Sequence, residues 1–337
     1  MLKLLFVGFG NVGQACVQLL HDQKDILEKE YGFKYKIVGI LDTVKGSVID
    51  ENGIDPVRVL DLAAKNLKLD EYAGGESFGD ALEVIKKIDA DVLLEATFTD
   101  IKTGEPATSY IKEAINRGMH IVTTNKGPLA LFYKEIKALA DKKGVKFLFE
   151  GTVVSGTPLL NLIRETLKGS GINSIQGILN GTTNYILTKM EEGMEYNAAL
   201  KKAQELGYAE AVPDADVEGW DALAKATILA NVVFDAGLKP DDIPCRGITK
   251  ITAGDIENAK KEGKRYKLLA KVSNEGGVVK AEVSPQKIDL LHPLASVSGA
   301  TNALTISSDA LNDVTIIGPG AGRKETGFSM LIDLLAI

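Results

Sequence analysis

The feature that most constrains the fold of this chain is a short glycine-rich segment near its start. An apolar run at residues 4–7 leads into Gly8, Gly10 and Gly13, spaced as G-x-G-x-x-G, and a helical pattern follows through residue 21. Such glycines suit a tight turn, a close approach of the backbone to a pyrophosphate, and close packing of a helix on a strand. Because the helix N-terminus offers N–H groups to an anion, the segment predicts dinucleotide binding.

Short apolar runs alternate with helical patterns over the first 150 residues. The runs cover residues 4–7, 36–41, 91–96, 120–123 and 146–149. Apolar runs of this length, bounded by turns and separated by helices, are typical of a parallel sheet that is covered on both faces. We therefore expect an α/β fold with a Rossmann-type doubly wound parallel sheet.

The pattern changes after residue 150, and a chain of 337 residues is long enough for two domains. A last helix is expected from about Thr326. The other segments are predicted as helices at 158–167, 184–192, 196–206 and 217–236, and as strands at 267–273, 278–283, 303–307 and 314–317. This order predicts an α+β domain with an antiparallel sheet and helices on one face.

Composition and charge argue against several other classes. The net charge of -7 comes from scattered charges of both signs, so nucleic acid is not an expected partner. The first apolar stretch is far shorter than the roughly 20 residues that span a bilayer, so no membrane association is expected. Cys16 and Cys245 lack CxxC spacing, which favours a reducing, cytoplasmic location. His21, His120 and His292 lack the spacing of a zinc site.

Two residues after the second expected strand bear on the choice of dinucleotide. Asp42 is placed to accept hydrogen bonds from the adenosine ribose, which favours NAD, whereas Lys45 could hold the 2'-phosphate of NADP. Because Asp42 favours NAD and Lys45 favours NADP, the sequence does not decide between the two cofactors. A solvated turn is the alternative interpretation of Asp42.

The densest polar cluster lies at the start of a long apolar helix. It contains Glu210, Asp214, Asp216, Asp221 and Lys225. Asp214 or Asp216 would serve as a helix cap. Asp221 and Lys225 are four residues apart and share one helix face, and burying this pair would be costly without a polar ligand or partners. A lysine beside a carboxylate could protonate the oxygen on which hydride addition to an aldehyde builds negative charge. The alternative is a surface ion pair.

A second lysine follows an expected parallel strand, in the segment 122–128. Ligands of doubly wound sheets bind beyond the carboxyl ends of the strands, so Lys126 is placed to face the ligand. The segment 95–100, after the preceding strand, is expected beside the same cofactor edge. A solvated loop lysine is the alternative interpretation.

Several separated segments together resemble homoserine dehydrogenase. They are TTNKGPLA at 123–130, EGTVVSGTPLL at 150–160, GILNGTTNYIL at 177–187, LGYAEAVPDADVEGWDALAK at 206–225 and GPGAGRKET at 318–326. The resemblance implies reversible, NAD(P)H-dependent reduction of aspartate 4-semialdehyde to homoserine, in threonine and methionine biosynthesis. It also implies a cytoplasmic homodimer that meets through its antiparallel sheet. The domains would be 1–150 with 319–337 for the nucleotide, and 151–318 for catalysis and dimerisation.

The resemblance also implies roles for individual residues. Lys225 would be the general acid and base, and Lys126 would lie near the substrate and the nicotinamide. With the residues already named, the expected substrate contacts are Glu210, Asp216, Asp221 and Thr182. The expected cofactor contacts are Gly8, Gly10, Asn11, Val12, Gly13, Asp42, Lys45, Thr97, Lys126, Gly207 and Gly322.

The same resemblance implies a structural sodium ion at Glu150, Val153, Ser155 and Thr157, held mostly by backbone carbonyls. Oxygen ligands suit such a hard cation.

Two departures from the family pattern alter what the resemblance implies about substrate binding and regulation. Val212 stands where relatives commonly have an acid, which changes the charge near the substrate. The chain also lacks an ACT or aspartate kinase segment, so no feedback by threonine through an ACT domain is expected.

Two other classes of protein are alternatives. An enzyme like aspartate-semialdehyde dehydrogenase needs a cysteine nucleophile, and neither Cys16, inside the cofactor helix, nor Cys245, in a proline-containing loop, suits that role. A nucleotide-sensing regulatory protein would have no use for the lysine and carboxylate cluster.

Overall fold

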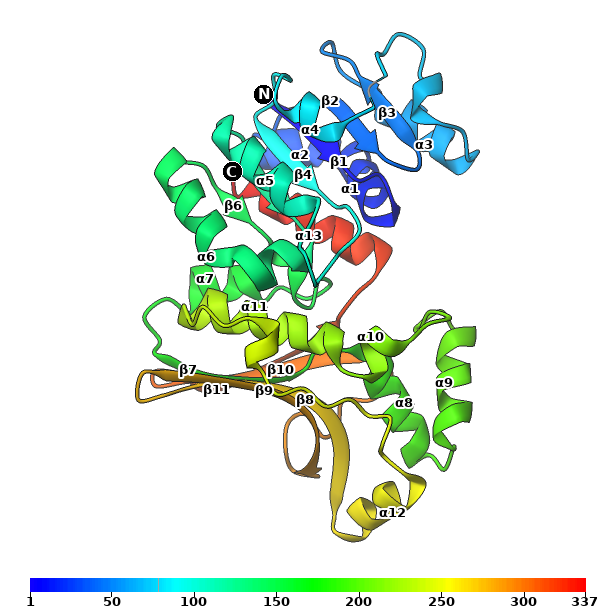
Figure 1. Ribbon diagram of the computed structural model, residues 1–337, viewed down its shortest axis with the longest axis vertical. Helices are drawn as coiled ribbons and strands as arrows, with labels where there is room; N and C mark the ends of the chain where they lie inside the picture. Colours follow the sequence, from blue (N-terminus) through cyan, green and yellow to red (C-terminus); the bar gives the residue numbers. More distant parts are fainter. Residues whose placement is uncertain (78) are drawn as a thin grey trace. The chain divides into compact units, whose positions relative to one another are not determined.

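The chain divides into two units, which are described separately. The computed structural model describes residues 1–77 and 79–337 (Figure 1). Unit 1 comprises Met1–Ser155 and Gly322–Ile337, and unit 2 comprises Gly156–Ala321. The last helix of the chain thus belongs to the same unit as the glycine-rich segment.

Unit 1 is built on a sheet in the order β3-β2-β1-β4-β5-β6 among the described residues. Every pairing is parallel except that of β2 with β3. The strands are β1 (Leu2–Val7), β2 (Tyr35–Asp42), β3 (Gly46–Ile49), β4 (Val92–Glu95), β5 (His120–Thr123) and β6 (Phe147–Leu148). The expected doubly wound sheet is confirmed, with β3 added as an antiparallel edge that the sequence pattern did not reveal.

Helices cover both faces of this sheet. They are α1 (Asn11–Asp22), α2 (Lys24–Tyr31), α3 (Pro56–Ala64), α4 (Ala81–Ile85), α5 (Ala107–Asn116), α6 (Lys126–Lys143) and α13 (Arg323–Leu335), with short 3-10 turns η1 (Leu69–Glu71) and η2 (Glu150–Thr152). Helix α13 packs beside α1, and α5 packs against β4, β5 and α6. The C-terminal helix therefore completes the layer that α1 begins.

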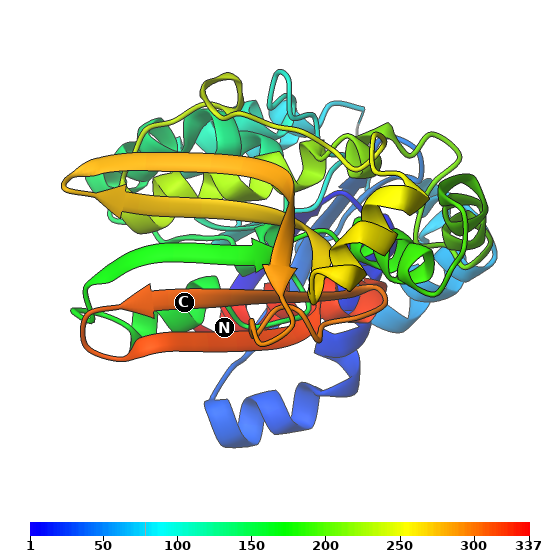
Figure 2. The ribbon, with the colours of Figure 1, turned by 90° about the horizontal axis from the view of Figure 1, so that it is seen from below.

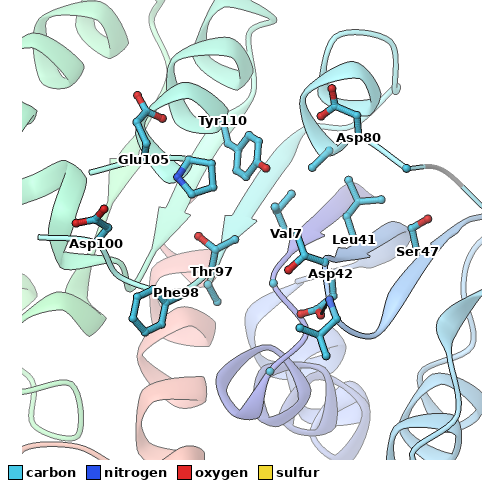
Figure 3. A pocket seen from close by; sticks show the side chains of 18 residues that line it. Val7, Leu41, Asp42, Ser47, Asp80, Thr97, Phe98, Asp100, Glu105 and Tyr110 are labelled. Atoms are coloured by element: carbon cyan, nitrogen blue, oxygen red, sulfur yellow. Dashed lines mark hydrogen bonds between the residues drawn. The ribbon is translucent and has the colours of Figure 1, made fainter. Parts of the chain in front are cut away.

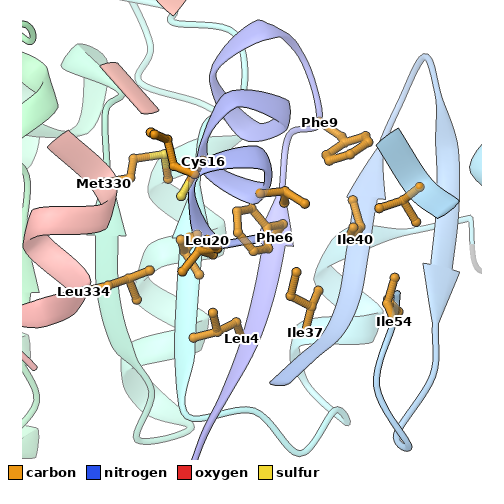
Figure 4. Close-up of a cluster of buried hydrophobic side chains, with 14 of the residues drawn as sticks. Leu4, Phe6, Phe9, Cys16, Leu20, Ile37, Ile40, Ile54, Met330 and Leu334 are labelled. Carbon is orange, nitrogen blue, oxygen red and sulfur yellow. The ribbon is translucent and has the colours of Figure 1, made fainter. Parts of the chain in front are cut away.

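Alternation along β1 explains the two layers. Leu4 and Phe6 belong to a buried cluster that also contains Leu20 of α1 and Leu334 of α13 (Figure 4). Leu5 lies between them in the strand and is equally buried, so it points to the other face. A strand that is buried on both faces needs the continuous apolar run that the sequence shows.

Unit 2 is built on an antiparallel sheet in the order β11-β10-β7-β8-β9, within the part of the chain that the structure describes. Figure 2 shows the β8–β9 hairpin on one side of β7 and the β10–β11 hairpin on the other. The strands are β7 (Ile172–Ile178), β8 (Lys264–Glu275), β9 (Val278–Asp289), β10 (Thr301–Ser308) and β11 (Asn312–Pro319). The expected antiparallel sheet is confirmed, although its central strand β7 was not predicted.

The helices of unit 2 pack largely against β8, β9 and β10. They are α7 (Leu160–Thr166), α8 (Gly181–Glu191), α9 (Tyr196–Glu205), α10 (Asp214–Val217), α11 (Trp220–Phe234) and α12 (Ala253–Lys261), with the 3-10 turn η3 (Pro240–Asp242). Helix α11 runs along one face of the sheet (Figure 1). Across residues 1–77 and 79–337, none of the helices combines the length and the apolar character needed to cross a membrane.

The long helix expected over 217–236 is interrupted near its start. Gly219 has a φ of +86°, a left-handed conformation that ends α10 and begins α11. The expected helix cap is also wrong, because Pro213 and Gly219 occupy the cap positions of α10 and α11. Asp214 and Asp216 instead lie in the first turn of α10, where acids complement the helix dipole.

Candidate active site

The glycine-rich turn of unit 1 requires glycine at two positions. Gly8 has a φ of +98°, and a side chain there would place its Cβ 2.4 Å from the Ala96 carbonyl oxygen. A Cβ on Gly13 would lie 2.4 Å from the Gly8 carbonyl oxygen. The turn therefore packs α1 directly against the strand ends, and Asn11 and Val12 form the first residues of α1. This is the geometry in which a helix N-terminus receives a phosphate.

Asp42 connects the end of β2 to this turn. Its carboxylate accepts hydrogen bonds from the backbone N–H groups of Phe9 at 2.7 Å, Val44 at 2.8 Å and Lys45 at 2.7 Å. A carboxylate has about four lone-pair sites, so one site remains for a ribose hydroxyl. Asp42 thus has a structural role that the sequence did not reveal, alongside the expected one.

A cavity of about 600 Å³ opens beside this turn (Figure 3). It is lined by Val7, Gly8, Gly10, Leu41, Asp42, Thr43, Val44, Ser47, Gly79, Asp80, Ala81, Ala96, Thr97, Phe98, Asp100, Glu105, Pro106 and Tyr110. Among these described lining residues there are four carboxylates and no lysine, arginine or histidine, and Lys45 is not part of the lining. Four of the expected cofactor contacts therefore line the cavity, namely Gly8, Gly10, Asp42 and Thr97.

Lys126 is the first residue of α6, directly after the N-cap Asn125. The side-chain oxygen of Asn125 accepts a hydrogen bond from the Gly127 N–H at 3.1 Å. The Asn125 amide nitrogen reaches back to the Phe98 carbonyl oxygen at 3.3 Å. Lys126 is therefore half-buried at a fixed helix start beyond the carboxyl end of β5, and the solvated-loop interpretation is wrong.

In unit 2, a buried hydrogen-bond network joins α8, α10 and α11. The Lys225 ammonium donates to the Asp221 carboxylate at 2.7 Å and to the Leu179 carbonyl oxygen at 2.6 Å. The Asn180 amide donates to Asp216 at 2.6 Å and to Asp221 at 3.0 Å. The Lys225 side chain is 9% exposed and that of Asp221 is 18% exposed, so the pair is not a surface ion pair.

The carboxylates of this network are not equivalent. Burial raises the pKa of Asp216 above its ordinary value, and the nearby charge of Asp221 adds to that increase. The Asn180 hydrogen bond and the charge of Lys225 oppose it. A carboxyl group and an ammonium thus share one dry site, which is the arrangement that binds a charged small molecule and transfers a proton.

The remaining expected contacts of unit 2 occupy different surroundings. Thr182 is buried in the first turn of α8, and its hydroxyl donates to the Tyr208 carbonyl oxygen at 2.6 Å. It also makes a side-chain hydrogen bond with Asp216, which opposes the rise of the pKa of that carboxyl group, so Thr182 belongs to the edge of the network. Glu210 is exposed, and the described residues do not bring it into the network of Lys225. Gly207 follows α9 with a φ of +73°, and Val212 is 74% exposed.

Gly322 of unit 1 forms the N-cap of α13 with a φ of +142°. This backbone conformation is one that residues with a side chain rarely adopt, so glycine is favoured there. The start of α13 thus lies in the same unit as the glycine-rich turn.

The segment expected to hold a cation has a strained backbone. Glu150 is 3% exposed, and Val153 and Val154 are fully buried. Val154 has a φ of +51°, which is a rare conformation for a β-branched residue and is typical of ligand clamps. The Ser155 hydroxyl lies 3.0 Å from that of Thr326. In unit 2, the Thr157 hydroxyl donates to the Pro319 carbonyl oxygen at 3.0 Å.

The sequence did not single out Asn180, although this residue holds Asp216 and Asp221 together. Its own oxygen caps α8 by accepting from the Thr183 N–H at 2.9 Å. An Asn before Gly-Thr-Thr is a recognisable helix start, but its two carboxylate partners lie 36 and 41 residues further along the chain. Only the tertiary structure brings the three side chains together.

A glycine-rich βα turn, a cavity beside it and a buried lysine–carboxylate pair are the combination expected of a nicotinamide-dependent dehydrogenase. Residues 8–150 match the family model "Homoserine dehydrogenase, NAD binding domain", and residues 158–335 match the model "Homoserine dehydrogenase". These matches cover most of the chain. The chain belongs to the homoserine dehydrogenase family.

Individual relatives agree over the full length. The chain is 46% identical over 338 residues to an NAD(+)-dependent homoserine dehydrogenase of Pseudomonas canavaninivorans, covering 99% of this chain and 96% of that one. It is 41% identical to a homoserine dehydrogenase of Methanocaldococcus jannaschii, covering 100% and 98%. A solved structure of a hyperthermophilic archaeal homoserine dehydrogenase in complex with NADPH is similar to this chain, with a TM-score of 0.85 at 28% identity, covering 99% of this chain and 96% of that one.

Proposed function

We propose that the chain catalyses the reversible, NAD(P)H-dependent reduction of aspartate 4-semialdehyde to homoserine. Unit 1 is the nucleotide-binding domain in this proposal, and unit 2 is the catalytic and dimerisation domain. The observation that carries the proposal is the set of hydrogen bonds made by the Lys225 ammonium. An ammonium has three N–H groups, and two of them are occupied by Asp221 and Leu179. The third is available to the reacting oxygen.

The chemistry divides between one hydride and one proton. A nicotinamide held at the glycine-rich turn would supply the hydride for the aldehyde carbon. The turn fits its pyrophosphate because a Cβ at Gly10 would meet nothing within 4 Å, so the backbone there is open to a close approach. Lys225 donates its proton to the oxygen that becomes negative, and it takes the proton back in the oxidative direction. Asp221 holds the lysine in place through its 2.7 Å hydrogen bond.

Charged groups at both ends of the substrate need fixed partners. Asp216 accepts a hydrogen bond from Asn180 with one oxygen, and its other oxygen would receive the substrate ammonium. The N-terminus of α8, which contains Thr182, suits the substrate carboxylate because helix N-termini attract anions. Lys126 would contact the substrate near the nicotinamide.

An alternative with a cysteine nucleophile gains no support. Burial raises the pKa of Cys16 above its ordinary value, and it also raises the pKa of Cys245. A thiol whose pKa is raised is a poor nucleophile, because the thiolate is the reactive form.

The test of the reaction is homoserine-dependent reduction of NAD and of NADP, followed by the near-ultraviolet absorbance of the reduced nicotinamide. Turnover with homoserine supports the proposal. Silence with both cofactors, in a protein that binds one of them, would favour a nucleotide-sensing protein or another substrate.

NAD is the proposed preferred cofactor. The described lining of the cavity carries carboxylates, including Asp42 and Asp80, and no basic side chain to neutralise a 2'-phosphate. A relative at 46% identity is named as NAD(+)-dependent, whereas the archaeal complex contains NADPH at 28% identity. The same assay with both cofactors tests the preference, and a higher kcat/KM for NADP would contradict it.

A structural sodium ion at Glu150, Val153 and Ser155, with Thr157 further along the chain, is also proposed. A buried carboxylate beside the strained turn at Val154 supports it, since oxygen ligands suit a hard cation. The expected result is a higher melting temperature in sodium chloride than in choline chloride at equal ionic strength. Equal melting temperatures would contradict the site.

We further propose a homodimer that meets through the sheet of unit 2. Ile317 of the edge strand β11 and Val278 of the edge strand β9 remain exposed in the single chain. Sedimentation velocity tests the dimer, and a monomer at micromolar concentration would contradict it.

A cytoplasmic location is supported by two unpaired cysteines, and cell fractionation tests it.

A further inference from the structure

Glu95, at the end of β4, is a completely buried carboxylate. It accepts hydrogen bonds from the Thr97 N–H at 2.8 Å, from the Thr97 hydroxyl, and from the Thr123 hydroxyl at 2.7 Å. The Asn125 amide nitrogen lies 3.4 Å away, at the outer limit of a hydrogen bond. All of these donors are neutral. A carboxylate at this depth is expensive, because burial without a cation opposes ionisation.

The burial of Glu95 raises the pKa of its carboxyl group, and the hydrogen bonds from Thr97 and Thr123 oppose that change. An apolar residue at the same position would avoid the cost altogether. The residues that Glu95 holds in place should therefore explain why a carboxylate occupies this position.

The network of Glu95 joins the loop after β4, which lines the cavity, to the end of β5 and the start of α6. Thr97, which lines the cavity, is held through both its backbone N–H and its hydroxyl. Thr123 ends β5, and its hydroxyl also accepts from the Asn125 N–H at 3.0 Å. Asn125 caps α6, whose first residue is Lys126. One carboxylate thus fixes the loop after β4 and the start of the helix that carries Lys126.

The strand order assigns this network to one half of a bound dinucleotide. A dinucleotide lies across the point where the strand order reverses, which here is between β1 and β4. Asp42, the last residue of β2, is on the adenosine side. Thr97 and Lys126, after β4 and β5, are therefore on the nicotinamide side, and Glu95 lies beneath them.

We propose that Glu95 is a positioning residue that fixes Thr97 and the Lys126-bearing end of α6 for the nicotinamide half of the cofactor. It does not touch the adenosine half. The inference rests on the proposed function only in that the cavity binds NAD(H). A residue with a general structural role would affect both halves of the cofactor equally, so the two halves must be measured separately.

The experiment compares NADH with ADP, which lacks the second ribose and the nicotinamide. Dissociation constants are measured by NADH fluorescence and by displacement with ADP, in the absence of homoserine. Glu95→Ala is expected to weaken NADH binding by about tenfold, equal to the loss of roughly one hydrogen-bonded anchor, and to leave ADP binding within about twofold. Ile121→Val, a smaller core residue in β5, is the control and should change neither constant.

Two conservative variants complete the design. Glu95→Gln keeps an oxygen for the Thr97 N–H and can donate to the Thr123 hydroxyl, so NADH affinity should return to within about threefold of the parent. Thr123→Val keeps the shape of a strand residue but removes one hydrogen bond to Glu95. It should weaken NADH more than ADP, and it decides the question if Glu95→Ala does not fold.

Parallel weakening of NADH and ADP in the variants that fold, or no weakening in either, would overturn the inference. A selective loss of NADH affinity that glutamine restores supports it. Because homoserine is absent from the measurement, failure of the proposed reaction is distinguishable, since it would be seen as NADH binding without turnover.

Discussion

Lys225 and Asp221 lie one turn apart on α11, and the lysine ammonium is 2.7 Å from the aspartate carboxylate. Asn180 extends this pair to Asp216 by donating to both carboxylates. The result is a continuous chain of polar side chains inside an otherwise apolar helix packing. Such a network is costly unless all its members are bonded, and its one remaining ammonium hydrogen identifies where a ligand oxygen should bind.

Replacing the lysine tests this directly. Lys225→Ala is expected to lower kcat by a factor on the order of 10² to 10⁴, because the forming alkoxide loses its general acid. Steady-state kinetics with homoserine measure the effect. Lys202→Ala, which removes an exposed lysine paired with Glu205, is the matched control and should retain activity. Near-normal turnover of Lys225→Ala would remove this residue from the role.

The cofactor preference can be tested at the end of β2. Asp42→Asn removes the charge and keeps one oxygen for the backbone N–H groups of Val44 and Lys45, while the bond from the Phe9 N–H to the second oxygen is lost. The ratio of kcat/KM for NAD over NADP should fall by about tenfold, since repulsion of the 2'-phosphate and a strong ribose acceptor are both lost.

The control for this variant is Asp22→Asn on α1, where an exposed carboxylate accepts a hydrogen bond from Gln18 and lies outside the cavity lining. Its cofactor ratio should match that of the parent. An unchanged ratio in Asp42→Asn as well would show that another group sets the preference.

Local patterns predicted the parts of the fold that depend on neighbouring residues. The Gly8 and Gly13 turn, the buried strands of unit 1 and the Asp221–Lys225 spacing all follow from short-range geometry. The strand β7, with the sequence INSIQGI, was missed because polar residues interrupt its apolar positions. Its burial also depends on partners in β8 and β10, which lie between 93 and 136 residues further along the chain.

The break at Gly219 and the role of Asn180 were missed for different physical reasons. A glycine within a helical pattern is usually tolerated, and only its left-handed φ divides α10 from α11 here. Asn180 joins segments that are distant in sequence, so no local pattern could pair it with Asp216. For Asp42, the sequence predicted a cofactor contact but did not predict the hydrogen bonds that the carboxylate accepts from three backbone N–H groups.

Asp216 should reduce stability while it supports binding. Its pKa is raised in the fold by burial, so the stability that its carboxyl group contributes is present below the unfolded value of about 3.9 and is lost as pH rises through the folded value. Asp216→Asn should therefore have a higher melting temperature than the parent near pH 7, and the difference should shrink toward pH 4. Its kcat/KM should fall by about tenfold or more through loss of a charged substrate contact.

Thermal unfolding across this pH range measures the effect, with Asp214→Asn as the control on the same helix turn, since its side chain is exposed. A stability difference that is constant with pH would contradict the raised pKa. Lost stability at neutral pH would show instead that the charge of Asp216 is compensated by Lys225.

The buried Lys267 of β8 should make the stability of the protein depend on pH in the alkaline range. It is 1% exposed, and its ammonium donates to Asn184 at 3.0 Å and to the Val297 carbonyl oxygen at 2.6 Å. Burial lowers its pKa to about 8 from the ordinary 10.5, with the nearby charge of Glu191 opposing the change. A lowered pKa means that the stability contribution is present above the unfolded value and is lost as pH falls through about 8.

The free energy of unfolding of the parent, relative to that of Lys267→Met, should therefore rise by about 3 kcal/mol between pH 8 and pH 10.5, and should change little below pH 8. Urea unfolding at several pH values measures this difference. Lys271→Met, four residues along the same strand and partly exposed, should show no comparable rise. A flat difference for Lys267→Met would mean that the buried ammonium keeps its ordinary pKa, because its bonds to Asn184 and Val297 then compensate fully for the loss of water.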